Sequence, residues 1–103
     1  MNLIEKNRTK LIELCENHNV QQLYMFGSIL TDKFNSKSDI DLLIQFASID
    51  ETAYFDNYMD LKEQFENLFQ RSIDLVENQA VRNPIFRKVL DREKQLIYER
   101  KTA

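Results

Sequence analysis

The sequence has 103 residues, enough to bury one hydrophobic core and too few for two ordinary domains, so we expect a single domain over residues 1–103. Fourteen basic and 17 acidic residues give a formal net charge of −3, which argues against direct nucleic acid binding as the main activity. Gly27 is the only glycine and Pro84 the only proline, which excludes collagen-like sequences, glycine linkers and phosphate loops built from several glycines.

Helix-like and strand-like patterns alternate along the chain. We expect helices over residues 2–17, 54–70 and from 84 onward, a short helix or turn over 28–34, and strands over 20–26, 39–46, 72–76 and 95–98. Asn2 and Glu5 resemble a capping box, and Asn83 with Pro84 is typical of a helix start. The alternation predicts an α/β or α+β fold, in which helices flank a small β-sheet of three to four strands.

Apolar side chains recur at helical spacing in the two later helices. They are Phe55, Tyr58, Met59, Phe65, Leu68 and Phe69 in the longer one, and Ile85, Phe86, Val89 and Leu90 in the last one. We expect both sets to face the core. The short connection between the first two strands permits an antiparallel pair, but the pattern leaves open whether the sheet is mixed or parallel.

Features outside the fold indicate the compartment. The single cysteine, Cys15, cannot form an intramolecular disulfide and lies in a helical pattern, where we expect a buried side chain. The first ten residues contain no apolar stretch of a signal peptide, and no window approaches the ~20 apolar residues that cross a membrane. These features predict a cytoplasmic protein without membrane binding.

Three aspartates occur where carboxylates are unfavourable. Asp39 and Asp41 are two residues apart in a predicted strand, so their side chains leave the same face. Asp74 lies between apolar residues in the third strand and joins them if the two strands are neighbours. A divalent cation relieves the repulsion, and three carboxylates around two cations fit two-metal phosphoryl or nucleotidyl transfer.

The single glycine supplies a second half of this site. Gly27 and Ser28 directly follow a buried strand, where free backbone N–H groups and a hydroxyl can bind phosphate oxygens. Each feature taken alone also fits a plain turn or a solvent-exposed strand. Their order and spacing together favour neighbouring phosphate and metal sites.

These residues carry a family resemblance. The segment FGSILTDKFNSKSDIDLLIQF, residues 26–46, resembles the G-S-x₁₀-D-x-D signature of the polymerase-beta-like nucleotidyltransferase superfamily. SIDLVE at 72–77 is similar to the strand of its third carboxylate, and NPIFR at 83–87 and LIYE at 96–99 are similar to its closing helix and strand. The chain resembles MNT-type minimal nucleotidyltransferases over nearly its whole length.

The resemblance implies a fold, a cofactor and partners. It implies a small mixed sheet flanked by helices, ATP or another NTP as substrate, Mg²⁺ in a two-metal site, and a HEPN-type RNase toxin as partner. By the same resemblance, Gly27 and Ser28 bind the triphosphate. The resemblance also implies that Asp39, Asp41 and Asp74 hold the metals and are catalytic. Many members have a small residue, an arginine and a second glycine where this chain has Leu30, Thr31 and Asp32.

Two classes of function follow. The first is an enzyme that moves AMP from ATP to a hydroxyl of a protein partner, as the antitoxin of a HEPN-type toxin. So short a chain has little left for an acceptor pocket, which favours a docking macromolecule as acceptor. The second is a non-catalytic antitoxin or nucleotide-binding module that neutralises its partner by binding alone. The sequence does not decide whether the protein forms a homodimer.

Overall fold

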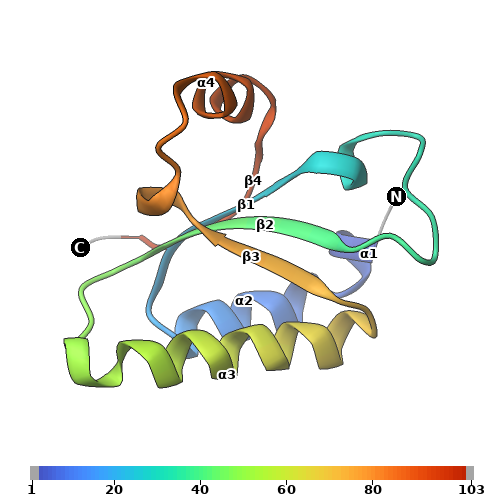
Figure 1. Ribbon diagram of the computed structural model, residues 1–103. Coiled ribbons are helices and arrows are strands. Elements are labelled where there is room, and N and C mark those ends of the chain that lie inside the picture. Colours follow the sequence, from blue (N-terminus) through green and yellow to red (C-terminus); the bar gives the residue numbers. More distant parts are fainter. Residues whose placement is uncertain (1–2, 102–103) are drawn as a thin grey trace.

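The computed structural model describes residues 3–101, which form a four-stranded sheet with helices on both faces (Figure 1). The strands are β1 (Val20–Phe26), β2 (Ile40–Phe46), β3 (Ile73–Glu77) and β4 (Gln95–Glu99), in the order β3-β2-β1-β4. β1 pairs antiparallel with β2 and β4, whereas β2 pairs parallel with β3. The sheet is therefore mixed, and the predicted fold class is confirmed.

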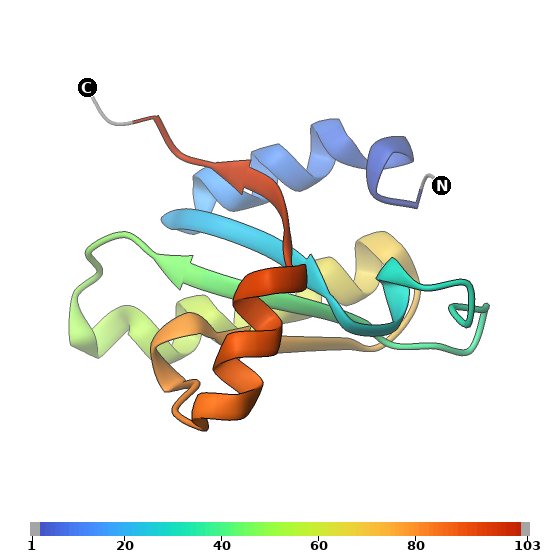
Figure 2. The same cartoon turned by 90° about the horizontal axis from the view of Figure 1, so that it is seen from above.

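Helices of unequal number cover the two faces of the sheet. α2 (Arg8–Asn17) and α3 (Glu51–Phe69) lie on one face, and α4 (Pro84–Glu93) lies on the other (Figures 1 and 2). Leu42 and Ile44 belong to the main core, so Leu43 alternates to the side of α4, where Leu90 is also buried. The main core comprises Ile4, Leu11, Leu14, Cys15, Val20, Leu23, Ile40, Leu42, Ile44, Leu61, Phe65, Phe69, Ile73, Leu75 and Ile97.

The predicted helix over residues 2–17 is interrupted. The structure has α1 (Leu3–Lys6) and α2, separated at Asn7. The Asn7 side-chain Nδ2 donates to Leu3 O at 2.8 Å, while its backbone N–H donates to Ile4 O at 3.1 Å. The amide side chain thus takes the carbonyl that the backbone N–H would use in a continuous helix. Asn2 of the predicted capping box lies outside the described residues.

The other boundaries follow local hydrogen bonds. α3 begins at Glu51, three residues before the predicted start, because the Asp50 carboxylate accepts from Thr52 N at 3.0 Å. The predicted Asn83 cap is confirmed, since its Oδ1 accepts from Ile85 N and Phe86 N at 3.0 Å each. η1 (Gly27–Leu30) and η2 (Asn78–Ala80) are short 3₁₀ turns.

Apolar surface is less completely buried than the helical spacing predicts. Phe65 and Phe69 are in the core, but Phe55 is 68% exposed and Met59 is also exposed. Of the predicted apolar face of α4, only Leu90 is buried. The prediction was wrong for Ile85, Phe86 and Val89, because α4 alone covers its face of the sheet and buries only the stripe that touches the strands.

Side chains cover part of both open sheet edges. On β4, Arg8 Nη1 donates to Ile97 O at 3.1 Å. On β3, the Tyr58 hydroxyl donates to Leu75 O, and Ile73 N donates to Glu66 Oε2 at 3.3 Å. These contacts use backbone groups that an edge strand otherwise offers to another strand. No helix within residues 3–101 is both long and apolar enough to cross a membrane.

The burial of Cys15 makes a testable prediction. Its side chain is fully buried, and this burial raises the pKa of the thiol to about 12. We expect a thiol reagent at pH 8 to leave Cys15 unmodified in the folded protein and to modify it within minutes in denaturant. Rapid labelling of the folded protein, followed by mass spectrometry, would contradict this packing.

Candidate functional site

The candidate site lies where three neighbouring strands begin or end. β1 ends at Phe26, which is paired with Asp41 of β2, and Asp41 in turn is paired with Asp74 of β3. Gly27 and Ser28 follow β1 at once, so the turn meets the carboxylates at one end of the sheet. We call Gly27, Ser28, Asp39, Asp41 and Asp74 the carboxylate edge.

Asp39 precedes its strand rather than lying in it. β2 begins at Ile40, and Asp39 is exposed at the end of the loop that leads into the strand. Ile40 and Leu42 face the core as predicted, and they leave Asp41 on the opposite face. Asp74 is exposed between the buried Ile73 and Leu75.

Gly27 and Asp41 are in direct contact. Gly27 has a φ of +77°, and a Cβ atom built on it would lie 2.2 Å from Asp41 Oδ2. A side chain at this position therefore meets both backbone strain and a collision with the carboxylate. The sequence predicts that the backbone needs its one glycine here, and the structure adds that Asp41 needs it too. Substitution of Gly27 consequently disturbs the fold more than the sequence suggests.

The turn after Gly27 is held by its own hydrogen bonds. The Thr31 hydroxyl and backbone N–H donate to Ser28 O at 2.8 and 2.9 Å. Leu30 lines a cavity of about 290 Å³ beside α1 and β4, and Asp32 is exposed. Thr31 therefore closes the turn and Leu30 contributes to packing at the positions where the chain departs from the family pattern.

Negative charge accumulates at the carboxylate edge. Burial raises the pKa of the Asp41 carboxyl, and the neighbouring Asp74 and Asp39 raise it further, whereas a hydrogen bond from the Ser28 backbone lowers it. Asp41 is half-buried while the other two carboxylates are exposed. A bound cation would favour the ionised form that this environment disfavours.

The donor chemistry suits Mg²⁺, although the side chains are not gathered around one point. Within residues 3–101, no three or more His, Cys, Asp or Glu side chains are arranged to hold a metal ion. The three carboxylates lie close enough to repel one another, and carboxylate oxygens are the ligands that Mg²⁺ takes in proteins. The metal set named from the sequence thus stays a prediction.

Arg71 orders the loop that carries Asp39, a role that only the structure reveals. Its Nη1 donates to Asn35 O at 3.0 Å and to Ser38 O at 2.9 Å. Its guanidinium carbon also lies 4.7 Å from the centre of the Phe34 ring. These contacts join the start of β3 to the residues just before Asp39.

The sequence does not reveal how α4 is attached beside the site. The Phe26 and Phe86 rings meet edge to face at 6.2 Å between centroids. Arg87 donates to Asn78 O and Oδ1 at 3.0 and 2.7 Å and pairs with Asp91 at 3.2 Å. Arg87 thus fixes the helix to η2, and no local pattern singles out Asn78 as its partner.

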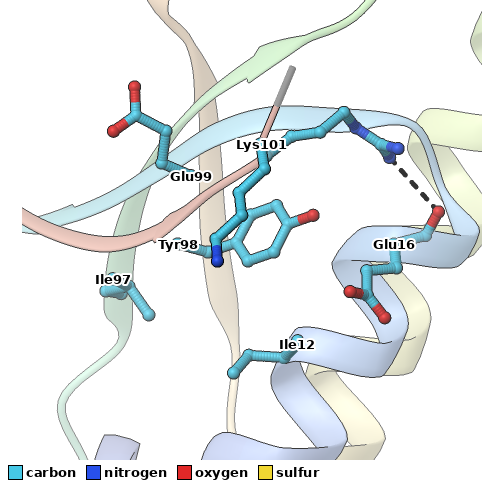
Figure 3. A pocket seen from close by; sticks show the side chains of 7 residues that line it. Ile12, Glu16, Ile97, Tyr98, Glu99 and Lys101 are labelled. Carbon is cyan, nitrogen blue, oxygen red and sulfur yellow. Dashed lines mark hydrogen bonds between the residues drawn. The ribbon is translucent and has the colours of Figure 1, made fainter. Parts of the chain in front are cut away.

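The candidate site does not coincide with a large cavity that lies elsewhere in the molecule. A cavity of about 630 Å³ lies between α2 and the end of β4 (Figure 3). Arg100 donates there to Glu16 O at 3.2 Å. None of its lining residues belongs to the carboxylate edge. The chemistry of the side chains therefore carries the assignment.

Comparison with known proteins decides the family. The sequence model described as Polymerase beta, Nucleotidyltransferase matches residues 9–103. The chain belongs to this nucleotidyltransferase family. It is 31% identical over 78 residues to the protein adenylyltransferase MntA of Thermococcus cleftensis, a match that covers 76% of each chain.

Solved structures share the fold of this family member. A toxin–antitoxin crystal structure with AMP-PNP matches with a TM-score of 0.67 at 20% identity, over 92% of this chain and 75% of the other. A tri-AMPylated Shewanella oneidensis HEPN toxin in complex with an MNT antitoxin matches with a TM-score of 0.62 at 19% identity, over 93% and 72%.

A double-mutant cycle tests the contact between Gly27 and Asp41. We expect Gly27→Ala to lower the free energy of unfolding by about 2 kcal/mol, since it adds positive-φ strain and a collision. In an Asp41→Ala background only the strain remains, so the cost should fall to about 1 kcal/mol. Equal costs in both backgrounds, measured by urea unfolding, would show that the two side chains do not compete for space.

The raised pKa of Asp41 predicts how stability depends on pH. Between its unfolded and folded pKa values, the folded state binds more protons than the unfolded state, so stability falls as pH rises through that window. In EDTA, Asp41→Asn should therefore raise the free energy of unfolding at neutral pH, and should raise it less at about pH 4. Asp56→Asn on α3 controls for loss of an exposed charge. Destabilisation by Asp41→Asn at every pH would contradict the assignment.

Proposed function

We propose that this protein transfers AMP from ATP to a hydroxyl of a protein partner. The observation that carries the proposal is the carboxylate edge, where Asp41 contacts Gly27 and is paired with Asp74. Membership of the nucleotidyltransferase family and a relative named protein adenylyltransferase support it.

The partner we propose is a HEPN-type toxin, with this chain as its antitoxin. Two structures that share the fold point in this direction, one a toxin–antitoxin with AMP-PNP and the other a tri-AMPylated HEPN toxin with an MNT antitoxin. Covalently attached AMP on the toxin is the product that the proposed reaction would leave. We place the reaction in the cytoplasm, where ATP and such a partner meet.

We assign each residue of the carboxylate edge a role in the reaction. Backbone N–H groups and the hydroxyl at Gly27–Ser28 bind phosphate oxygens, and the single glycine keeps side chains away from them. Asp39, Asp41 and Asp74 would hold Mg²⁺ in a two-metal site. Bound there, Mg²⁺ would neutralise the triphosphate and polarise the α-phosphoryl group.

We assign to Asp74 the role of accepting the proton of the acceptor hydroxyl. It is exposed at the edge strand of the sheet, where a docking protein can reach it. The acceptor oxygen forms a bond to the α-phosphorus, and the bond from this phosphorus to the bridging oxygen breaks. Pyrophosphate leaves, AMP remains on the acceptor, and the hydroxyl proton passes to the Asp74 carboxylate.

A second candidate is an antitoxin that neutralises its partner by binding alone. It is favoured by the contact between Asp41 and the Ser28 backbone, because the carboxylate then occupies a donor that a phosphate would use. The residues Leu30, Thr31 and Asp32 in place of the usual pattern favour it as well.

The transfer assay separates the two candidates. The protein is incubated with radiolabelled ATP, Mg²⁺ and the product of the neighbouring gene. We expect label on that partner, and we expect Asp39→Asn with Asp41→Asn to reduce the transfer rate at least about a hundredfold. Asp56→Asn with Asp60→Asn on α3 removes the same charge away from the site and should leave the rate unchanged. Label that persists undiminished in the Asp39/Asp41 variant would overturn the assignment of these two residues.

Complex formation and neutralisation complete the test. If the Asp39/Asp41 variant still binds the partner but no longer neutralises it, catalysis is required. If neutralisation survives substitution of all three aspartates, binding suffices and the second candidate is correct.

A further inference from the structure

Part of the apolar stripe of α4 is exposed to solvent. Ile85 is 77% exposed, Phe86 42% and Val89 36%. Val89 lies four positions after Ile85 and three after Phe86, so the three side chains form one stripe along the helix. Figure 1 shows α4 on the side of the sheet opposite to α2 and α3. Contiguous exposed apolar side chains of this kind mark interaction surfaces.

The stripe is continuous with the carboxylate edge. The Phe86 ring packs against the ring of Phe26, the last residue of β1, which is paired with Asp41 and precedes Gly27. A molecule that lies on α4 therefore reaches the proposed site of chemistry without crossing another element.

The charge around the stripe is opposite to that of the whole chain. Residues 82–94 contain five basic and two acidic residues, although the protein has a formal net charge of −3. Arg87 and Lys94 pair with Asp91, and Arg92 pairs with Glu93. Arg82 and Lys88 are exposed and form no ion pair within residues 3–101. Lys88 lies one turn from Ile85, so at least one free cation borders the apolar stripe.

We propose that the outer face of α4 docks the protein acceptor and selects acceptors whose hydroxyl is flanked by apolar and acidic side chains. This inference rests on the proposed transfer function, because it names the class of substrate for that reaction. Apolar residues of the acceptor cover Ile85 and Val89, and its carboxylates pair with Arg82 and Lys88. A second copy of this chain fits less well, since it would bring the same cations against one another.

Pairing of the acceptor's carboxylates with the cations near α4 also reduces their repulsion by the carboxylate edge. Asp39, Asp41 and Asp74 repel an approaching acidic acceptor, and the cations near α4 hold its carboxylates at a distance from them. The acceptor hydroxyl can then approach Asp74 while its acidic neighbours lie over the basic helix.

Peptide binding without ATP tests the surface separately from the chemistry. Two fluorescein-labelled peptides each carry one tyrosine and the same apolar residues, one with flanking glutamates and the other with flanking lysines. We expect the wild type to bind the acidic peptide about tenfold more tightly by fluorescence anisotropy. Arg82→Glu with Lys88→Glu should reverse this preference, whereas Lys6→Glu, which changes an exposed lysine on α1, should preserve it.

A matched pair of variants tests the apolar part. Ile85→Ser should weaken binding of the acidic peptide about tenfold, because it removes most of the exposed stripe at one end. Phe55→Ser changes a side chain that is 68% exposed on α3, on the other face of the sheet, and should have no effect. Sensitivity to Phe55→Ser but not to Ile85→Ser would overturn the proposal.

Two further measurements separate failure of the surface from failure of the function. If peptide preference persists but no AMP is transferred to the acidic peptide, the surface stands and the transferase activity fails. If AMP is transferred with a kcat/KM that Ile85→Ser and the charge reversal leave unchanged, the surface is wrong. Loss of Mg²⁺–ATP binding in these variants by calorimetry, with peptide binding intact, would assign α4 to the nucleotide and overturn the proposal. A wild-type protein that is a dimer, and that Ile85→Ser converts to a monomer, would also overturn the proposal.

Discussion

The contact between Gly27 and Asp41 is the constraint on which the carboxylate edge depends. The backbone at Gly27 turns through a positive φ directly after β1, and the Asp41 carboxylate occupies the space that any Cβ would need. This close approach is what allows the turn at Gly27–Ser28 and a strand with a carboxylate to meet. The single glycine of the chain lies where the end of β1 meets the carboxylate of β2.

Sheet order follows from this meeting. Antiparallel pairing of β1 and β2 brings the end of β1 beside the start of β2, and parallel pairing of β2 and β3 adds Asp74 to the same edge. Helices α2 and α3 bury the other face, so the stability of the fold comes mainly from a core that contains none of these residues. The site can therefore carry mutually repelling carboxylates, since the cost falls on a protein already held together elsewhere.

Local patterns predicted much of the fold and of the candidate site. The β1 boundaries, the Asn83 cap and the spacing of Gly27, Asp39 and Asp41 are visible in the sequence, because each depends on residues near one another in the chain. Asp74 joins them only through the parallel pairing of β2 and β3. The break at Asn7 escaped prediction because a side-chain amide competes there with a helix bond that the periodicity favours.

Long-range relations could not be read in the same way. The role of Arg71 depends on a loop more than thirty residues away in the chain, and exposure of Phe55 and Ile85 depends on how much of each helix the sheet covers. Helical spacing identifies an apolar stripe but does not say whether the molecule itself buries all of it. The exposed part of α4 became evident only when its neighbours were known.

Nucleotide binding in the Gly27 variant tests the central claim most directly. Calorimetric titration with AMP-PNP and Mg²⁺ should give a clear binding isotherm with the wild type. With Gly27→Ala, under conditions where circular dichroism shows a folded protein, binding should be lost, because the added methyl displaces Asp41 and blocks approach to the Ser28 backbone. Unchanged affinity for AMP-PNP in the folded variant would contradict the account.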